Sequence, residues 1–265
     1  MRNAFIILLS SLAIGGCELN APEAADASAA LARLVAAAEQ GDGAAQFELG
    51  EHHARGLGLP QDDALALEWY QRAADQGVKQ AQYHLGLLYY NGRGTPQDLD
   101  AAMKWWLLAA AQNHAEARYQ LGMMYYNGVG VAQDLVVAME WLRAAAGQGL
   151  ASAQTTVGMM YDIGQGVAQN YHEAVKWYRL AARQGDTMAQ YNLALMYDIG
   201  QGLSQDRAEA YVWFSVLAAN SNDAHLVEAR DRTASELSSS RLSAARKKAA
   251  RLAEEIHDHR NSQAN

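Results

Sequence analysis

Hydrophobic and small residues recur along most of this chain at the spacing of a buried helix face. In the clearest copy, four residues mark one face of a helix expected over 80–90: Ala81, Leu85, Gly86 and Tyr89. A second helix is expected to bury a further set: Ala102, Trp105, Ala109 and Ala110. The segment Gly92-Arg93-Gly94 lies between them, and its glycines predict the turn that ends the first helix. Gly86 has no side chain, so we expect the second helix to approach closely there.

The whole pattern returns every 36 residues without a gap. The tryptophan occurs five times in phase, as Trp69, Trp105, Trp141, Trp177 and Trp213. A residue able to cap the second helix precedes it in every copy, as Asp62, Asp98, Asp134, Asn170 and Asp206. Residues that tolerate left-handed geometry follow four of these helices, namely Gly77, Asn113, Gly149 and Gly185. A fixed period of this length indicates stacked units, so we expect an array.

Composition supports a helical array and argues against one class of partner. Half of the 265 residues are hydrophobic and only three are proline, which favours an all-α fold. The formal net charge is -8, whereas nucleic-acid binding needs a basic stripe. We therefore expect no nucleic-acid partner.

The first residues have the pattern of an export signal. Arg2 precedes an apolar run over 4–14 that is short for a membrane-spanning helix. The run ends in Gly15-Gly16-Cys17, which resembles the lipobox of bacterial lipoproteins and implies lipidation of Cys17. We expect 1–17 to be a signal peptide with a lipobox and 18–27 to be a tether. An ordinary cleaved signal with a chance cysteine is the alternative.

The 36-residue pattern resembles the Sel1-like repeat family, a relative of the tetratricopeptide repeats. The resemblance covers five copies over 42–221 and includes the Leu-Gly, Gly-x-Gly, Trp and Ala-Ala elements. Departures are confined to the end copies, at His53, Ala194 and Leu217. The resemblance implies an all-α solenoid of stacked helix-turn-helix repeats, wound as a right-handed superhelix.

Helical caps are expected at both ends of the array. Residues 28–41 predict a capping helix before the first copy. After the fifth copy, 222–259 predicts two C-terminal capping helices, over 223–233 and 240–257. Residues 260–265 are expected to form a disordered tail.

Patterns that would carry chemistry are weak. The paired glycines lack the third glycine of a dinucleotide site and follow no strand. The histidine pairs at His52 and His53 and at His257 and His259 have no further ligands at metal-site spacing. Some cysteine-rich members of the family have been credited with β-lactam binding or hydrolysis, but they carry paired cysteines and this chain has one. We therefore expect no cofactor, no metal and no catalytic residue.

The concave face is the candidate binding surface. In tetratricopeptide stacks the first helix of each unit lines the groove, so its outward positions should meet a partner. These positions combine aromatic, methionine and polar side chains, the composition of a peptide-binding surface. Tyr83, Tyr119 and Tyr191 recur in phase and could instead serve the fold. The predicted surface comprises Tyr83, Leu87, Tyr90, Asn91, Tyr119, Met123, Tyr126, Asn127, Met159, Asp162, Tyr191 and Asp198.

The sequence thus predicts a non-enzymatic scaffold or adaptor that binds a partner protein or peptide in this groove. The lipid on Cys17 would hold it on the periplasmic face of the cell envelope, and Glu18, which is not the aspartate of inner-membrane retention, favours the outer membrane by resemblance. Two other functions stay open, a hydrolase acting on cell walls or β-lactams and a structural spacer.

Overall fold

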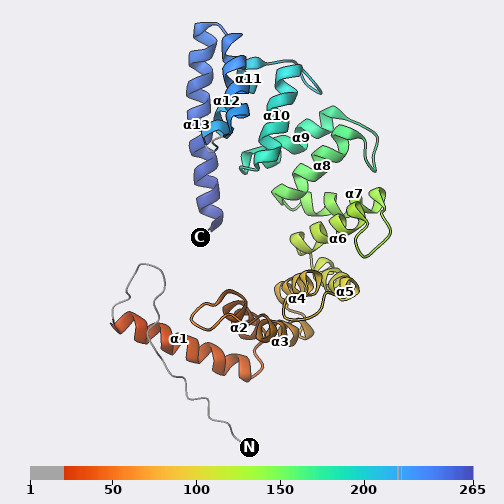
Figure 1. Cartoon of the computed structure of the whole chain (residues 1–265), viewed down its shortest axis with the longest axis vertical. Helices are drawn as coiled ribbons and strands as arrows, with labels where there is room; N and C mark the ends of the chain where they lie inside the picture. The colour runs from red at the N-terminus through yellow and green to blue at the C-terminus, as the bar shows by residue number, and fades with distance from the viewer. Residues whose placement is uncertain (1–20, 220, 222, 265) are drawn as a thin grey trace, which may run out of the picture. The chain divides into compact units, whose positions relative to one another are not determined.

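A computed structural model describes residues 21–219, 221 and 223–264. Within these ranges the protein consists of thirteen α-helices and contains no strand, which confirms the all-α fold class (Figure 1). The predicted signal peptide, Cys17 and residues 18–20 lie outside the described residues.

The chain divides into two compact units, and each is described by itself. Unit 1 is Met1–Gln112, and its helices are α1 (Ala21–Glu39), α2 (Gly43–Arg55), α3 (Asp63–Asp75), α4 (Lys79–Asn91) and α5 (Leu99–Ala111). Unit 2 is Asn113–Asn265, and its helices are α6 (Ala115–Asn127), α7 (Leu135–Ala146), α8 (Ala151–Ile163), α9 (Tyr171–Arg183), α10 (Thr187–Ile199), α11 (Arg207–Ala219), α12 (Ala224–Ser235) and α13 (Ser239–Ala264).

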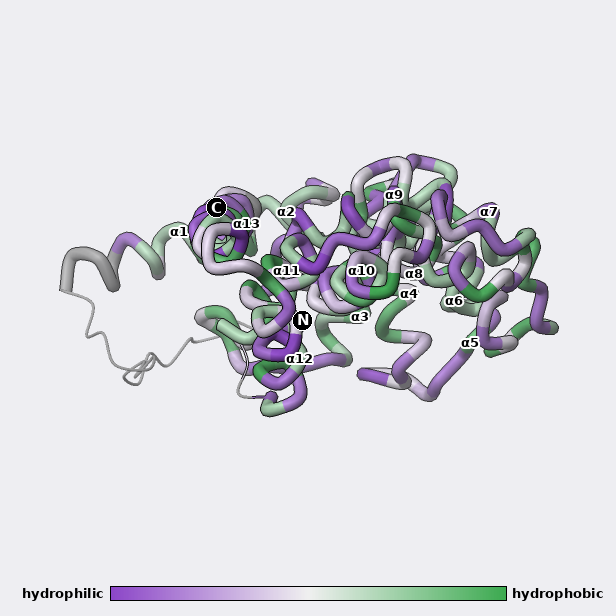
Figure 2. The backbone as a smooth tube through the Cα atoms, turned by 90° about the horizontal axis from the view of Figure 1, so that it is seen from above, coloured by the Kyte–Doolittle hydropathy of each residue, from purple (hydrophilic) through white to green (hydrophobic). Residues whose placement is uncertain are grey.

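Both units are built from pairs of antiparallel helices. An even-numbered first helix packs on the following second helix, as α2 on α3, α4 on α5, α6 on α7, α8 on α9 and α10 on α11. Successive pairs then pack through α3 and α4 in unit 1, and through α7 to α10 in unit 2. Hydrophobic and hydrophilic residues are interspersed along these helices, as an amphipathic pattern requires (Figure 2).

The predicted ends of the helices are confirmed. Asp98 accepts a hydrogen bond from the Ala101 amide at 2.8 Å, and the equivalent residues of the other copies cap their helices in the same way. Gly77, Asn113, Gly149 and Gly185 all have positive φ angles. Side-chain caps therefore mark where the second helices begin, and a residue with a positive φ angle follows the end of four of them.

In three of the loops, at Gly94, Gly166 and Gly202, the second glycine does more than turn the chain. A Cβ atom on Gly94 would lie 2.3 Å from the carbonyl oxygen of Asp63, at the start of the second helix in the preceding repeat. The same atom on Gly166 would lie 2.1 Å from the carbonyl oxygen of Leu135. Glycine is thus required because adjacent repeats touch backbone to backbone at this point.

The prediction that Trp105 is the buried tryptophan was wrong. Trp105 is half-buried, whereas the next residue, Trp106, is 0% exposed. Trp106 continues the stripe of Ala102, Ala109 and Ala110, because residues four, seven and eight positions apart share one helix face. The residue after the recurring tryptophan is fully or almost fully buried in every copy, as Tyr70, Trp106, Leu142, Tyr178 and Phe214.

The predicted close approach of the second helix to the first at Gly86 is confirmed. A Cβ atom there would lie 2.4 Å from Nε1 of Trp106. A second contact between neighbouring repeats was not predicted from the sequence. Gln82 is buried, and its Nε2 donates to the Ala74 carbonyl at 3.2 Å. Its Oε1 accepts from Nε2 of Gln112 at 2.9 Å. Gln46, Gln154 and Gln190 make the same bond to the preceding helix, so a 36-residue recurrence of glutamine was the available signal.

The structure differs from the predictions at both ends of the array. Helix α1 begins at Ala21 rather than at residue 28, so 21–27 form helix and not a tether; the alanine-rich sequence there favours this. Helix α13 continues to Ala264, whereas 260–265 were expected to be disordered. The Arg260 side chain donates to the Gly185 carbonyl, which holds this part of α13 against the turn between α9 and α10.

Candidate partner-binding surface

The predicted surface residues of unit 1 lie on α4, and three of them also stabilise the fold. The Tyr90 ring lies 5.4 Å from the Trp106 ring, and Nε1 of Trp106 donates to the Tyr83 carbonyl at 3.1 Å. Asn91 is exposed and donates from Nδ2 to the Leu87 carbonyl at 2.9 Å, which satisfies the end of the helix. Tyr83 and Tyr90 are thus half-buried and lie at the edge of the predicted face.

Unit 1 also carries a charged cluster that sequence analysis missed. Glu51 accepts a short hydrogen bond from the Tyr70 hydroxyl, and its Oε1 lies 3.4 Å from Nδ1 of His84. The Phe47 and His84 rings are 5.5 Å apart beside it. Glu51 stands 36 residues before Leu87, so the repeat register alone could have placed it on the predicted face.

Burial raises the pKa of Tyr70, and the hydrogen bond to Glu51 raises it further. The phenol therefore stays protonated at neutral pH and donates to the carboxylate rather than acting as a nucleophile. The Glu51 carboxylate also has a cationic partner, because Nη1 of Arg55 lies 3.5 Å from its Oε2. The cluster is therefore a paired carboxylate beside aromatic rings.

In unit 2, the predicted residues of α6 and α8 are mostly half-buried. Tyr119, Met123 and Met159 pack against the core of the unit. Tyr126 donates from its hydroxyl to Oε1 of Gln165 at 2.7 Å, in the loop of the next repeat. Asn127 is exposed at the end of α6. These side chains therefore link repeats as well as facing outwards.

The two predicted aspartates differ. Burial raises the pKa of Asp162, and the Tyr178 hydroxyl, 3.4 Å away, opposes the rise. Asp198 is bound at 2.6 Å by Arg232 of α12 and lies 3.9 Å from Arg207. Its side chain is only 12% exposed, so Asp198 anchors α12 rather than offering a free carboxylate to a partner.

The most open apolar surface of the first helices lies on α8 and α10. Met188, Tyr191 and Ile199 are 60%, 42% and 62% exposed, and they share one side of α10 because they are spaced by three and eight residues. Ile163 of α8, 36 residues before Ile199, is 51% exposed. We call the following set the α8–α10 stripe: Met159, Ile163, Met188, Tyr191, Leu195 and Ile199.

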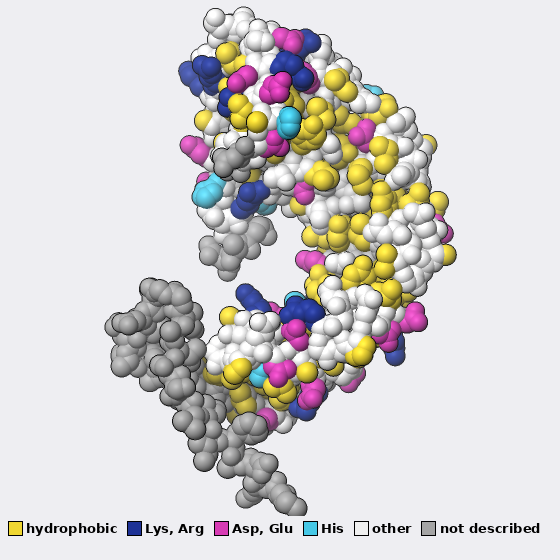
Figure 3. Space-filling model, viewed as in Figure 1, with side chains coloured by type: hydrophobic (Ala, Val, Ile, Leu, Met, Phe, Trp, Pro, Cys, Tyr) yellow, Lys and Arg dark blue, Asp and Glu magenta, His cyan; other side chains and the backbone are white. Residues whose placement is uncertain are grey.

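Figure 3 shows hydrophobic side chains gathered over the region of these helices. Sequence analysis placed Met159 and Tyr191 on the face but missed Ile163, Met188 and Ile199. The available signals were the 36-residue spacing of Ile163 and Ile199, and the position of Met188 on the same side of α10 as Ile199.

No group of three or more potential metal ligands occurs among the described residues. In the same part of the chain no helix has both the length and the apolar content needed to cross a membrane.

The family model described as Sel1 repeat matches this chain five times, over residues 43–78, 79–114, 115–150, 151–186 and 187–222. A protective antigen present in uropathogenic Escherichia coli strains, displaying an SLR fold, is 36% identical with a TM-score of 0.75. The match covers 91% of this chain and 50% of that one, so this chain spans half the length of the antigen. A Sel1 repeat protein from Oxalobacter formigenes is 35% identical, with a TM-score of 0.69 and coverage of 76% and 83%. No curated protein matches the chain.

Proposed function

Because the chain belongs to the Sel1 repeat family, whose members are generally protein-interaction scaffolds, we propose that it is a non-enzymatic scaffold that binds a partner protein or peptide. The proposed contact surface is the first-helix face of its repeats. In unit 2 this face is centred on the α8–α10 stripe.

The exposed side chains of the stripe carry this proposal. Isolated exposed apolar residues are ordinary on any protein, whereas a contiguous apolar stripe marks an interaction site. Met188 and Ile199 lie near opposite ends of α10, with Tyr191 and Leu195 between them. Burying them would release water from apolar surface, and a rigid helical frame lowers the entropy cost of binding.

The proposal includes a place in the bacterial envelope. The lipobox-like sequence that ends at Cys17 supports a lipid anchor on the periplasmic face, with the outer membrane favoured. The Escherichia coli relative is a protective antigen, and a protein that the host meets is consistent with export. Labelling with a radioactive fatty acid would test this part, because a Cys17→Ser variant should lose the label.

Affinity capture from solubilised envelope tests the partner-binding part. The test variant is Met188→Ser with Ile199→Ser, which removes exposed apolar surface from the stripe. The matched control is Val136→Ser with Leu180→Ser, since these second-helix residues are 59% and 49% exposed. We expect the partner with the native protein and the control, and its loss from the test variant.

Equal capture by both variants would contradict the role of the stripe. Both variants should have the same melting temperature as the native protein. Any loss of the partner would then come from the changed surface and not from unfolding.

A further inference from the structure

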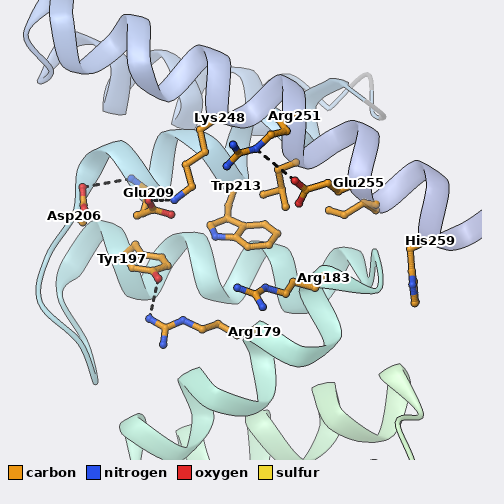
Figure 4. A pocket seen from close by; sticks show the side chains of 12 residues that line it. Arg179, Arg183, Tyr197, Asp206, Glu209, Trp213, Lys248, Arg251, Glu255 and His259 are labelled. Carbon is orange, nitrogen blue, oxygen red and sulfur yellow. Dashed lines mark hydrogen bonds and ion pairs between the residues drawn. The ribbon is translucent and has the colours of Figure 1, made fainter.

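Unit 2 also contains a cleft that no residue of the α8–α10 stripe lines. It lies between α9, α10, α11 and α13 (Figure 4). Its volume is ≈ 690 Å³. Small-molecule sites usually measure about 300–1,000 Å³. The cleft is therefore large enough for a small organic ligand.

The carboxylates around the cleft already have cationic partners. Asp206 accepts from Arg241 at 3.0 Å, and Glu209 is paired with Lys248. Glu255 lies 3.4 Å from Arg251 on the same face of α13. The acidic groups are thus neutralised by the chain itself and leave the remaining cations unopposed.

Two arginines of α9 supply those remaining cations. Arg179 donates to the Tyr197 hydroxyl at 2.8 Å and lies 5.5 Å from that ring, without a carboxylate partner among the described residues. Arg183, one helical turn later, makes no described hydrogen bond or ion pair, and its guanidinium points towards Trp213 (Figure 4). An otherwise acidic protein thus holds two guanidinium groups beside one cleft.

Three apolar side chains also line the cleft, and two of them present only a small part of their surface to it. Trp213 of α11 lines the cleft and is 6% exposed, and Ile256 of α13 is 5% exposed. Leu252 of α13 is the third of these side chains. Guanidinium groups bind carboxylate and phosphate oxygens through paired N–H donors, while the apolar side chains suit a ring or an aliphatic chain.

Helix α13 is attached to the rest of unit 2 in its first half and near its end, which favours a cleft that is formed before a ligand binds. Arg241 and Lys248 fix its first half to α11. Near its end, Arg260 donates to the Gly185 carbonyl. The Arg260 guanidinium lies directly over Gly185, where a Cβ atom would be 2.3 Å from its Nε.

We infer that this cleft binds a small organic anion, a molecule with one carboxylate or phosphate group and an apolar body. Arg183 and Arg179 hold the oxygens, and Trp213, Leu252 and Ile256 cover the apolar body. This site is separate from the proposed partner surface and does not depend on it.

Isothermal titration of the full chain with four probes tests the inference. Phenyl phosphate and phenylacetate combine an anion with a ring, and comparing them distinguishes a phosphate ligand from a carboxylate. Inorganic phosphate carries the charge alone, and benzyl alcohol carries the ring alone. We expect at least one of the two combined probes to bind more tightly than either single-feature probe, with binding that weakens as salt is added.

Arg183→Gln is the test variant, because Arg183 is exposed and its loss removes no described contact. Arg143→Gln is the matched control, since Arg143 stands at the place of Arg179 in the preceding repeat and does not line the cleft. We expect the affinity for the combined probes to fall about tenfold or more in the test variant, because a charged hydrogen bond is lost. The affinity of the control variant should stay unchanged.

Equal affinity in the native protein and Arg183→Gln would overturn the inference. The absence of binding by both combined probes at millimolar concentration would overturn it as well. Circular dichroism spectra and melting temperatures of the variants should match those of the native protein. A loss of probe binding would then come from the changed cleft and not from unfolding.

Discussion

The first-helix faces of the two units present different chemistry on the same helical frame. In unit 1, Glu51 binds Tyr70 and lies beside His84, so the face carries a charged cluster. In unit 2, Leu195 occupies the position of Glu51, and Met188 and Ile199 extend an apolar surface around it.

The inward positions of the same helices do not differ in this way. Leu85 of unit 1 and Leu193 of unit 2 stand at the same repeat position, and both are 0% exposed. A few outward positions can therefore change the surface chemistry of each unit without altering how its helices pack.

The largest effect should come from breaking the shared frame. Trp106→Ala should lower the free energy of unfolding by about 3–5 kcal/mol, because it empties a fully buried site. Trp105→Ala should cost roughly 1–2 kcal/mol, since the half-buried indole already keeps part of its surface in water. Urea unfolding followed by circular dichroism measures both. Equal losses would mean that the residue after the recurring tryptophan does not hold the repeat together.

A smaller effect should come from the glycine where paired helices meet. A Cβ atom on Gly158 would lie 2.8 Å from the Tyr178 ring, so Gly158→Ala should destabilise unit 2 by about 1–3 kcal/mol. Ala194 fills the same position one repeat later, and Ala194→Gly should cost about 1 kcal/mol through weaker helix propensity. Thermal melting would compare them. A stabilised Gly158→Ala protein would show that the helices can move apart at no cost.

The charged cluster of unit 1 should matter less for stability than the frame. Glu51→Gln should lower the free energy of unfolding by about 1 kcal/mol, because the Tyr70 hydroxyl would then donate to a neutral amide oxygen in place of a charged carboxylate. Glu48→Gln, on an exposed neighbour, is the control and should leave the melting temperature unchanged. Partner binding through unit 2 should survive both changes. Loss of that binding in Glu51→Gln would place the contact on unit 1 as well.

The smallest effect should come from Asp162. Burial raises the pKa of its carboxyl in the folded state, so the folded protein takes up a proton more readily than the unfolded chain. This contribution to stability is present at low pH and is lost as pH rises through the folded pKa. Asp162→Asn should therefore stabilise the protein at pH 7, by less than about 1 kcal/mol because water screens the group, and should give no gain under acidic conditions. Melting curves across pH measure this, and a pH-independent difference would contradict it.

Most of the fold followed from the sequence because its signals are local. The period, the capping residues and the turn glycines each act within a few residues of their own position. The sequence did not show which of Trp105 and Trp106 is buried, since both are large and aromatic. Only the packing of Trp106 on α4 distinguishes them.

The candidate sites were less predictable because they depend on distant contacts. Asp198 looked available until Arg232, 34 residues later in the chain, proved to bind it. The cleft beside Arg183 exists only because α13 packs on α11. The α8–α10 stripe was partly predictable, because Tyr191 and Met159 follow from the repeat register.

The most direct test of the account is site-specific photo-crosslinking in living cells. A benzophenone side chain would replace Ile199 in the α8–α10 stripe, Leu87 on the unit 1 face, or Leu180 on a second helix. We expect a discrete protein adduct from position 199 and none from position 180. An adduct from position 87 would extend the contact with the same partner to unit 1. An adduct from position 180 with none from position 199 would contradict the account, because the partner would then lie on the second helices.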